Sequence, residues 1–372
     1  MNNYQRCTRC VMDNKQDNFI SFDQQGYCEY CIEALKNKNL VYFPNTEGRD
    51  KLDRLIDKLK KEGKGKKYDC LMGISGGLDS SYLLYLGYQW GLRILAVHVD
   101  DSFDAPIATR NIEQLCDKCN IDLKVLKPDE EQFCDLTRAF VYAEVPNLAM
   151  PQDNILFAEL YNLAKKHNVK TFLSGGNFAL ESILKPDGSV NCFDLGHIRD
   201  INKRYGTKPI NKLNMMSNYQ RVLDRYLFGI KTVRPLNYID YNKNKAIKEL
   251  NEFCGFVYYE TKHCENILTK VNQLYWLVKK FGDDKRTSHL SSLIVSGQMT
   301  REEALAELNK PPYDKEQMES DIEFFCNKIN ISVKDFNTMV SRPGKSHDEY
   351  KVSCIYKFVR RFFSRWILSF KG

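Results

Sequence analysis

The residues that could do chemistry begin with one short run, SGGLDSS, at positions 75–81. The apolar run DCLMGI at 69–74 predicts a buried strand before it, and SSYLLYLGYQWG at 80–91 predicts a helix after it. Glycines let a backbone approach a ligand closely, and the N–H groups at the start of a helix bind anions. The stretch therefore predicts a phosphate-binding loop between a strand and a helix.

Asp79 is the residue that phosphate alone does not explain, because a carboxylate repels phosphate. A bridging Mg2+ removes this conflict. A second loop, SGGNFALES at 174–182, follows another predicted strand and offers Glu181 as a second carboxylate. We therefore predict that Asp79 and Glu181 bind Mg2+ on a polyphosphate, although Glu181 also suits the first turn of an ordinary helix. SGGLDSS is not a Walker A loop, since it lacks the G-x4-G-K-[ST] pattern.

The surrounding sequence alternates strands and helices. Further strands are predicted at 93–100, 121–126 and 169–175, and helices at 107–119 and 153–167. This alternation predicts an α/β fold with a parallel sheet and helices on both faces, and ligands of such sheets bind beyond the carboxyl ends of the strands. The residues predicted to bind the polyphosphate, which the resemblance given below implies to be ATP and pyrophosphate, lie there: Ser75, Gly76, Gly77, Leu78, Asp79, Ser80, Ser81, His98, Asp100, Gly175, Gly176 and Asn177. His98 is equally suited to an ordinary place at a strand end.

Two cysteine pairs near the start predict a metal site. Cys7 and Cys10 form one C-x2-C pair, and Cys28 and Cys31 form the other. Four thiolates at this spacing suit one tetrahedral Zn2+, and four sulfur ligands make the zinc structural rather than catalytic. Four unligated thiols are the alternative. The pair at 116–119 has no second pair, and we interpret it as two small residues on a helix.

Composition narrows the class of protein. The chain has 372 residues, of which 43% are hydrophobic and 28% charged, as in a globular protein of two or more domains. It has no apolar run long enough for a spanning helix and no signal-like start, so we expect a cytoplasmic protein. Residues 351–372 contribute +6 of the net charge of +7. The nearly neutral body argues against a nucleic-acid partner.

Several motifs in one order extend over nearly the whole chain. They are the cysteine pairs, SGGLDSS, GGNFALES, RPLNYI at 234–239, KHCE at 262–265, KFGDDKR at 280–286, HLSSLI at 289–294 and the helix that ends in PPY at 311–313. SGGLDSS resembles the PP-loop of the N-type ATP pyrophosphatases, whose fold is adenine nucleotide alpha hydrolase-like. The full set resembles the N-acetyl sugar amidotransferases of bacterial surface-polysaccharide biosynthesis, which make lipopolysaccharide, O-antigen or other glycans.

The resemblance implies a reaction. The acetamido oxygen of an acidic, nucleotide-linked N-acetyl sugar attacks the α-phosphate of ATP, pyrophosphate leaves, and ammonia then displaces AMP to give an acetamidino group. It also implies that Asp79, Lys262, His263 and Lys285 take part in catalysis and that Lys280 and Arg286 bind substrate. The cofactors would be ATP, Mg2+ and structural Zn2+. Because no glutaminase domain is evident, ammonia would come from partners that resemble the glutaminase and cyclase subunits of imidazole glycerol phosphate synthase.

We predict four parts: a zinc-ribbon-like module at 1–45, the PP-loop domain at 46–250, a helical substrate or partner region at 251–345, and a basic amphipathic tail at 346–372. Apolar residues recur at helical spacing in the tail between lysines and arginines. The tail would pack on its own domain, dock on a partner, or lie peripherally on the inner face of an anionic membrane.

Two other functions compete with the amidotransferase. A tRNA thiolation enzyme also joins cysteine pairs to a PP-loop, but it needs a catalytic thiol such as Cys134, Cys192 or Cys264 and a face that binds RNA. A non-catalytic zinc adaptor would not need the acidic and glycine residues that both predicted phosphate loops retain.

Overall fold

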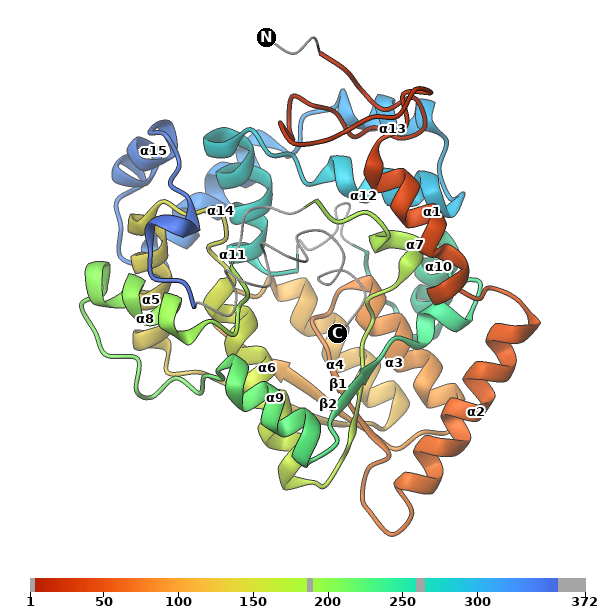
Figure 1. Ribbon diagram of the computed structural model, residues 1–372. Helices are drawn as coiled ribbons and strands as arrows, with labels where there is room; N and C mark the ends of the chain where they lie inside the picture. Colours follow the sequence, from red (N-terminus) through yellow and green to blue (C-terminus); the bar gives the residue numbers. More distant parts are fainter. Residues whose placement is uncertain (1–3, 186–189, 259–264, 354–372) are drawn as a thin grey trace.

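The computed structural model describes residues 4–185, 190–258 and 265–353, and Figure 1 shows their arrangement. The strands are β1 Cys70–Gly73, β2 Ile94–Val99, β3 Asp122–Leu126, β4 Thr171–Leu173 and β5 Lys231–Val233. The helices are α1 Glu29–Val41, α2 Thr46–Glu62, α3 Leu78–Gln89, α4 Pro106–Cys119, α5 Glu130–Ala143, α6 Met150–Lys166, α7 Phe178–Glu181, α8 Leu195–Tyr205, α9 Asn218–Leu227, α10 Lys243–Cys254, α11 Ile267–Lys270, α12 Arg286–Ser296, α13 Arg301–Leu308, α14 Lys315–Lys328 and α15 Val333–Ser341. The 3-10 turns η1 Pro235–Tyr238 and η3 His347–Glu349 and the π-helical segment η2 Val271–Phe281 complete the described elements.

The strands form one parallel sheet in the order β3-β2-β1-β4-β5. Met72 of β1 pairs with Ala96 of β2 on one side and with Leu173 of β4 on the other. The predicted α/β fold with a parallel sheet is therefore confirmed. Because all strands run the same way, their carboxyl ends lie at one edge, and the loops after β1 and β4 begin there.

Alternating side chains cover the two faces of the sheet, as the period of two in a strand requires. Cys70 and Met72 belong to the core that includes the apolar residues of α3, α4 and α10. Leu71 and Val97 belong to the core that includes α6. Burial on both faces explains why β1 and β2 are almost continuously apolar.

A third core is helical. It joins side chains of α5 and α8 to those of η2, α14 and α15 around the fully buried Trp276, whose indole N–H donates to the carbonyl oxygen of Val145 at 2.9 Å. Helices α5, α8 and α9 lie where the sequence pattern predicted neither a strand nor a helix. The predicted domain limits at 45, 250 and 345 stay predictions.

The N-terminal segment lies against the helices of the C-terminal half (Figure 1). The guanidinium of Arg301 donates to the carbonyl oxygens of Cys7 and Cys10, at 3.0 and 3.1 Å, and the Val11 N–H donates to Ser291 Oγ at 3.3 Å. The segment is thereby held on α12 and α13. In the part of the chain that the structure describes, no helix combines the length and the hydropathy needed to cross a bilayer.

Candidate nucleotide site and metal centre

The loop after β1 has the backbone of an anion cradle. Gly76 has a φ of +78°, and a Cβ there would lie 2.6 Å from the carbonyl oxygen of Ala108, so both conformation and space require glycine. Helix α3 begins after Gly77, and within the described residues no side chain caps this end. Its first N–H groups are therefore available to an anion.

The two glycine loops meet, as the sequence predicted for a shared site. A Cβ on Gly175 would lie 2.8 Å from the carbonyl carbon of Asp79. Asn177 holds the second loop in shape, because its side chain donates to Gly175 O and accepts from the Leu180 N–H at 2.9 Å. Asn177 does not line the cavity described below, and its predicted contact with ATP stays a prediction.

Asp79 is held by a residue that sequence reasoning missed. The hydroxyl of Tyr241 donates to Asp79 Oδ1 at 2.5 Å. Tyr241 is buried, and burial, followed by the charge of Asp79, raises its pKa well above the ordinary value, so the hydroxyl stays a donor. The ring packs on Tyr82, and Gln298 donates to the carbonyl oxygen of Tyr241 at 2.9 Å. The sequence feature that could have identified Tyr241 is its place as an aromatic residue just after the motif RPLNYI.

Glu181 and Arg234 lie together over the second loop. A Cβ on Gly176 would come within 3.1 Å of Glu181 Oε2 and 3.5 Å of Arg234 Nε. Arg234 begins the motif RPLNYI, and Asn237 of that motif accepts the Phe178 N–H at 2.7 Å, which fixes the start of α7. The motif thus brings a guanidinium beside a predicted Mg2+ ligand.

A third carboxylate reaches the phosphate loop from the C-terminal half. Ser75 Oγ donates to Glu265 Oε1 at 3.1 Å, and a Cβ on Gly77 would lie 2.8 Å from that same oxygen. The backbone of Glu265 is fixed, since its carbonyl oxygen accepts the Ala105 N–H at 2.9 Å. Glu265 closes the motif KHCE, of which Lys262 and His263, both predicted catalytic, lie outside the described residues.

His98 forms a buried pair at the end of β2. Its Nδ1 lies 3.0 Å from the carbonyl oxygen of Ile74 and its Nε2 lies 3.0 Å from Asp104 Oδ2. Burial works against a charge on His98, but the carboxylate of Asp104 outweighs it and the pKa of His98 is raised. Two acceptors around one ring favour an imidazolium. Asp100 instead pairs with Lys127 at 2.9 Å and is not among the residues that line the cavity.

One cavity of about 1040 Å3 connects these groups. Its lining includes Ser75, Gly77, Leu78, Asp79, Ser80, His98, Gly175, Gly176, Glu181, Arg234 and Glu265. Ser81, predicted to bind ATP, is fully buried outside the lining, and its hydroxyl has no hydrogen-bond partner among the described residues. The buried side chain of Ser81 offers no surface to the cavity, and its predicted contact with ATP stays a prediction.

The predicted substrate cations differ in their placement. Lys285 and Arg286 line the cavity at the start of α12, although Arg286 also donates to Asp284 at 2.7 Å and to nearby carbonyl oxygens. Lys280 lies outside the lining with a fully buried side chain, and its ammonium donates to Glu144 at 2.7 Å and to the carbonyl oxygen of Arg342 at 2.9 Å. The predicted substrate contact of Lys280 is therefore corrected to a structural one.

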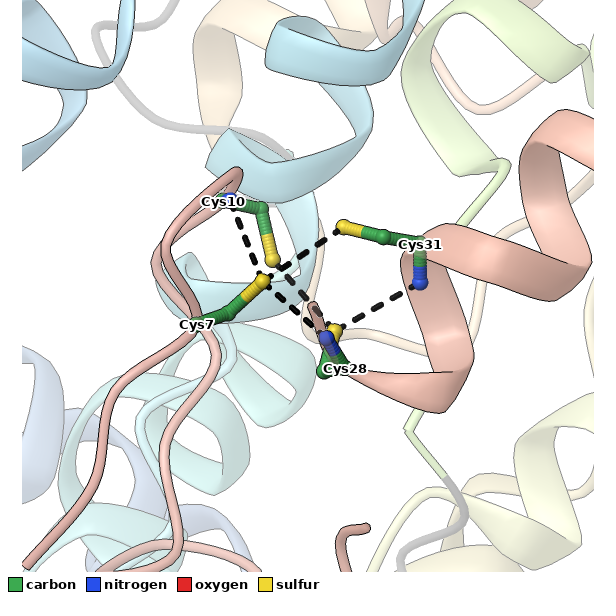
Figure 2. A group of neighbouring side chains, drawn as sticks. All are labelled: Cys7, Cys10, Cys28 and Cys31. Carbon is green, nitrogen blue, oxygen red and sulfur yellow. Dashed lines mark hydrogen bonds between the residues drawn. The ribbon is translucent and has the colours of Figure 1, made fainter. Parts of the chain in front are cut away.

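Figure 2 shows the four N-terminal cysteines converging on one point. Their sulfur atoms all lie within 4.8 Å of one another, with 4.0 Å between Cys7 and Cys31 and 3.6 Å between Cys10 and Cys28. Zinc–sulfur bonds of about 2.3 Å in a tetrahedron separate sulfur atoms by about 3.8 Å. Backbone N–H groups donate to Cys7 Sγ from Cys10 and Cys28 at 3.4 and 3.2 Å, which suits a thiolate. The cluster fits one tetrahedral ion.

The same N-terminal segment supports the wall of the cavity. Gln16 Oε1 accepts the Asp284 N–H at 3.1 Å and the Thr287 hydroxyl at 3.3 Å. These residues flank Lys285 and Arg286, which line the cavity. A metal-bound module would therefore hold the cationic end of α12 in place.

Comparison with known proteins supplies a family for part of the chain. Residues 265–362 match the family described as LPS (lipopolysaccharide) biosynthesis protein WbpG-like, C-terminal domain. The match confirms the predicted resemblance to surface-polysaccharide biosynthesis proteins. The chain is also 24% identical over 321 residues to the uncharacterized protein MJ1599 of Methanocaldococcus jannaschii, an alignment that covers 84% of this chain and 95% of that protein.

Three solved structures are similar at low sequence identity. NMN synthetase from Francisella tularensis is 16% identical with a TM-score of 0.29, and the match covers 59% of this chain and all of that one. NH3-dependent NAD synthetase from Campylobacter jejuni is 15% identical with a TM-score of 0.29, over 56% of this chain and 93% of that one. The U34-tRNA thiolase NcsA from Methanococcus maripaludis, solved with its [4Fe-4S] cluster, is 15% identical with a TM-score of 0.33, over 80% and 88%.

Proposed function

We propose that this chain, whose residues 265–362 match a WbpG-like domain of lipopolysaccharide biosynthesis, is an ATP-dependent amidotransferase for an N-acetylated sugar. The observation that carries the proposal is the meeting of two glycine loops, with Asp79, Glu181 and Arg234, at the carboxyl edge of the sheet. Glycine loops at a helix start bind phosphates. Carboxylates beside them would repel a phosphate unless a cation were bound between the two.

The proposed reaction has two steps. In the first, the acetamido oxygen forms a bond to the α-phosphorus of ATP while the bond to the β-phosphate oxygen breaks, and pyrophosphate leaves. In the second, ammonia bonds to the imidate carbon, the bond from that carbon to the AMP oxygen breaks, and an acetamidino group and AMP remain. Adenylation is needed because hydroxide is a poor leaving group from an amide.

Each group of residues in the site would have its own role in this reaction. The N–H groups at the start of α3 and the hydroxyls of Ser75 and Ser80 would bind the leaving pyrophosphate. Asp79 and Glu181 would hold Mg2+, which neutralises charge on the phosphates. Arg234 and Lys285 would stabilise the charge that grows on phosphate oxygens as the first bond breaks.

Bases that line the cavity would suit the proposed substrate, and a partner would supply the ammonia. Bases line the same cavity, including Lys285 and Arg286 from α12, and would suit an acidic, nucleotide-linked sugar. Ammonia would come from a partner glutaminase with a cyclase-like subunit. Structural zinc in the cysteine cluster would keep α12 in place through Gln16.

Product analysis tests the proposal. The protein is incubated with Mg·ATP, ammonium and a panel of nucleotide-linked N-acetyl sugars, and AMP, pyrophosphate and the sugar product are measured by mass spectrometry. The expected result is AMP that depends on one sugar, together with a product in which NH replaces O. Asp79→Asn should abolish AMP formation, while Asp23→Asn, an exposed residue of the N-terminal segment, should not change it.

The competing tRNA thiolation function has weaker support in the geometry. Cys134 is buried, and burial raises its pKa to about 11. Neither Cys134 nor Cys192 lines the cavity, and Cys264 lies outside the described residues. AMP formation that needs tRNA and no sugar would replace the proposed amidotransferase with this function.

A further inference from the structure

Helix α9 buries a charged residue and exposes large apolar side chains, unlike an ordinary surface helix. Asp224 is its fully buried residue, and the Lys165 ammonium from α6 pairs with it at 3.0 Å. The large apolar side chains of the same helix face outward, with Tyr219 73% and Tyr226 79% exposed. An ordinary amphipathic helix places its apolar stripe on the core and its charges in water.

The exposed residues form one surface. Tyr219, Val222 and Tyr226 have the spacing i, i+3 and i+7, which places them on one side of a helix. Leu227, 72% exposed, and the half-exposed Phe228 extend this stripe at the end of the helix. We call these five residues the α9 stripe. In Figure 1, α9 lies at the outer edge of the molecule beside α6.

Basic residues surround the α9 stripe. Arg225 is exposed beside it on the same helix and also lines the edge of the cavity, whereas the Lys165 ammonium, 5.9 Å from the ring centre of Phe228, is already paired with Asp224. Lys170 contacts the next turn at Gly229, and its carbonyl oxygen accepts the N–H of Lys231. Lys231 itself pairs with Glu62 at 3.7 Å and lines the cavity, so it does not belong to the rim of the stripe. Arg225 and Lys170 are therefore the exposed bases beside the α9 stripe, and an anionic surface would complement their charge.

The apolar stripe and the basic residues beside it limit what kind of partner could cover this surface. If two copies of the chain paired symmetrically through α9, Arg225 of one copy would lie near Arg225 of the other. These like charges would repel each other. A lipid bilayer with anionic headgroups offers acyl chains to the apolar stripe and negative charge to the bases beside it. Tyrosine, leucine and phenylalanine above a basic rim are the composition of helices that lie in a membrane interface.

We infer that the α9 stripe rests on an anionic lipid bilayer, with the apolar side chains among the acyl chains and the flanking bases at the phosphate headgroups. Ten residues of helix are enough to lie in the plane of the interface without spanning it. The contact is separate from the basic tail at 346–372 that the sequence identified, and it does not depend on the proposed amidotransferase reaction.

Vesicle co-sedimentation of the full chain tests the inference. The vesicles are phosphatidylcholine alone or phosphatidylcholine with phosphatidylglycerol, and the partition coefficient is measured at low and high salt. The expected result is binding to the anionic vesicles that weakens with salt. Leu227→Ser with Phe228→Ser should lower the partition coefficient by about 30-fold, and Arg225→Gln by about fivefold. Phe19→Ser, which changes an 83% exposed residue of the N-terminal segment, is the matched control and should bind as the unchanged chain does.

Three results would overturn the inference. One is the absence of binding to anionic vesicles. Another is binding that the double substitution leaves unchanged and that deletion of residues 354–372 abolishes, which would assign the contact to the tail. The third is a change in molecular mass by light scattering on substitution, without vesicle binding, which would assign the stripe to a second copy or a protein partner. Circular dichroism confirms that each variant is folded.

Discussion

Tyr241→Phe is the substitution that tests how the site positions Asp79. The ring of Tyr241 is buried against Tyr82 and stays the same size, so no cavity is created and the loss is confined to one hydroxyl. That hydroxyl donates to Asp79 Oδ1 at 2.5 Å. A phenylalanine removes this hydrogen bond, which helps to orient the carboxylate that would bind Mg2+.

The magnitude follows from the kind of hydrogen bond. A bond to a charged group contributes about 1.5–3 kcal/mol. If the proposed chemistry uses the carboxylate in this orientation, its loss lowers kcat/KM for ATP by roughly 10- to 150-fold. We also expect the Mg2+ concentration for half-maximal rate to rise, because orientation of a metal ligand is what is lost.

The chain offers a matched control. Tyr82 is a buried neighbour whose hydroxyl donates to Glu249 at 2.8 Å, and Tyr82 does not line the cavity. Tyr82→Phe therefore removes a similar bond from the same helix layer. AMP formation and unfolding by urea are measured for both variants. Equal losses of kcat/KM in the two variants, or full activity of Tyr241→Phe at low Mg2+, would refute the positioning role.

Further substitutions separate structural from functional groups. Lys280→Met should lower the unfolding free energy by about 3 kcal/mol, since it leaves Glu144 buried, and should spare the activity of the folded fraction. Lys285→Met should lower AMP formation at least tenfold with little change in stability. Urea titration and AMP assays of both variants check these results. Cys28→Ser should release about one zinc per chain by elemental analysis and lower the melting temperature, and a chelator should do the same to the unchanged chain. Burial raises the pKa of Asp101 from 3.8 to about 7, so the folded chain binds the proton more tightly than the unfolded chain. The unfolding free energy should therefore fall as pH rises across that window, and Asp101→Asn should flatten this slope in urea titrations.

The sequence was sufficient for the parts of the site that are local. SGGLDSS, the cysteine pairs and the alternation of strands with helices each lie within a short window, and the structure has the predicted loop, cluster and parallel sheet there.

What the sequence could not predict depends on distant contacts. Tyr241 meets Asp79 across 162 positions of the chain, and Glu265 meets Ser75 across 190. Lys280 and Lys285 are indistinguishable as bases around a glycine turn, and only packing buries one and places the other on the cavity. Helix α9, where the sequence predicted no element, buries Asp224 in a pair with Lys165 and leaves its large apolar side chains exposed.

The measurement that tests the central claim most directly follows one oxygen atom. The N-acetyl sugar that supports AMP formation is prepared with oxygen-18 in its acetamido group and is converted with Mg·ATP and ammonium. The account predicts that the label appears in the phosphate of AMP, because the amide oxygen bonds to the α-phosphorus before ammonia displaces it. Label in pyrophosphate or in water, with none in AMP, would contradict adenylation of the amide oxygen.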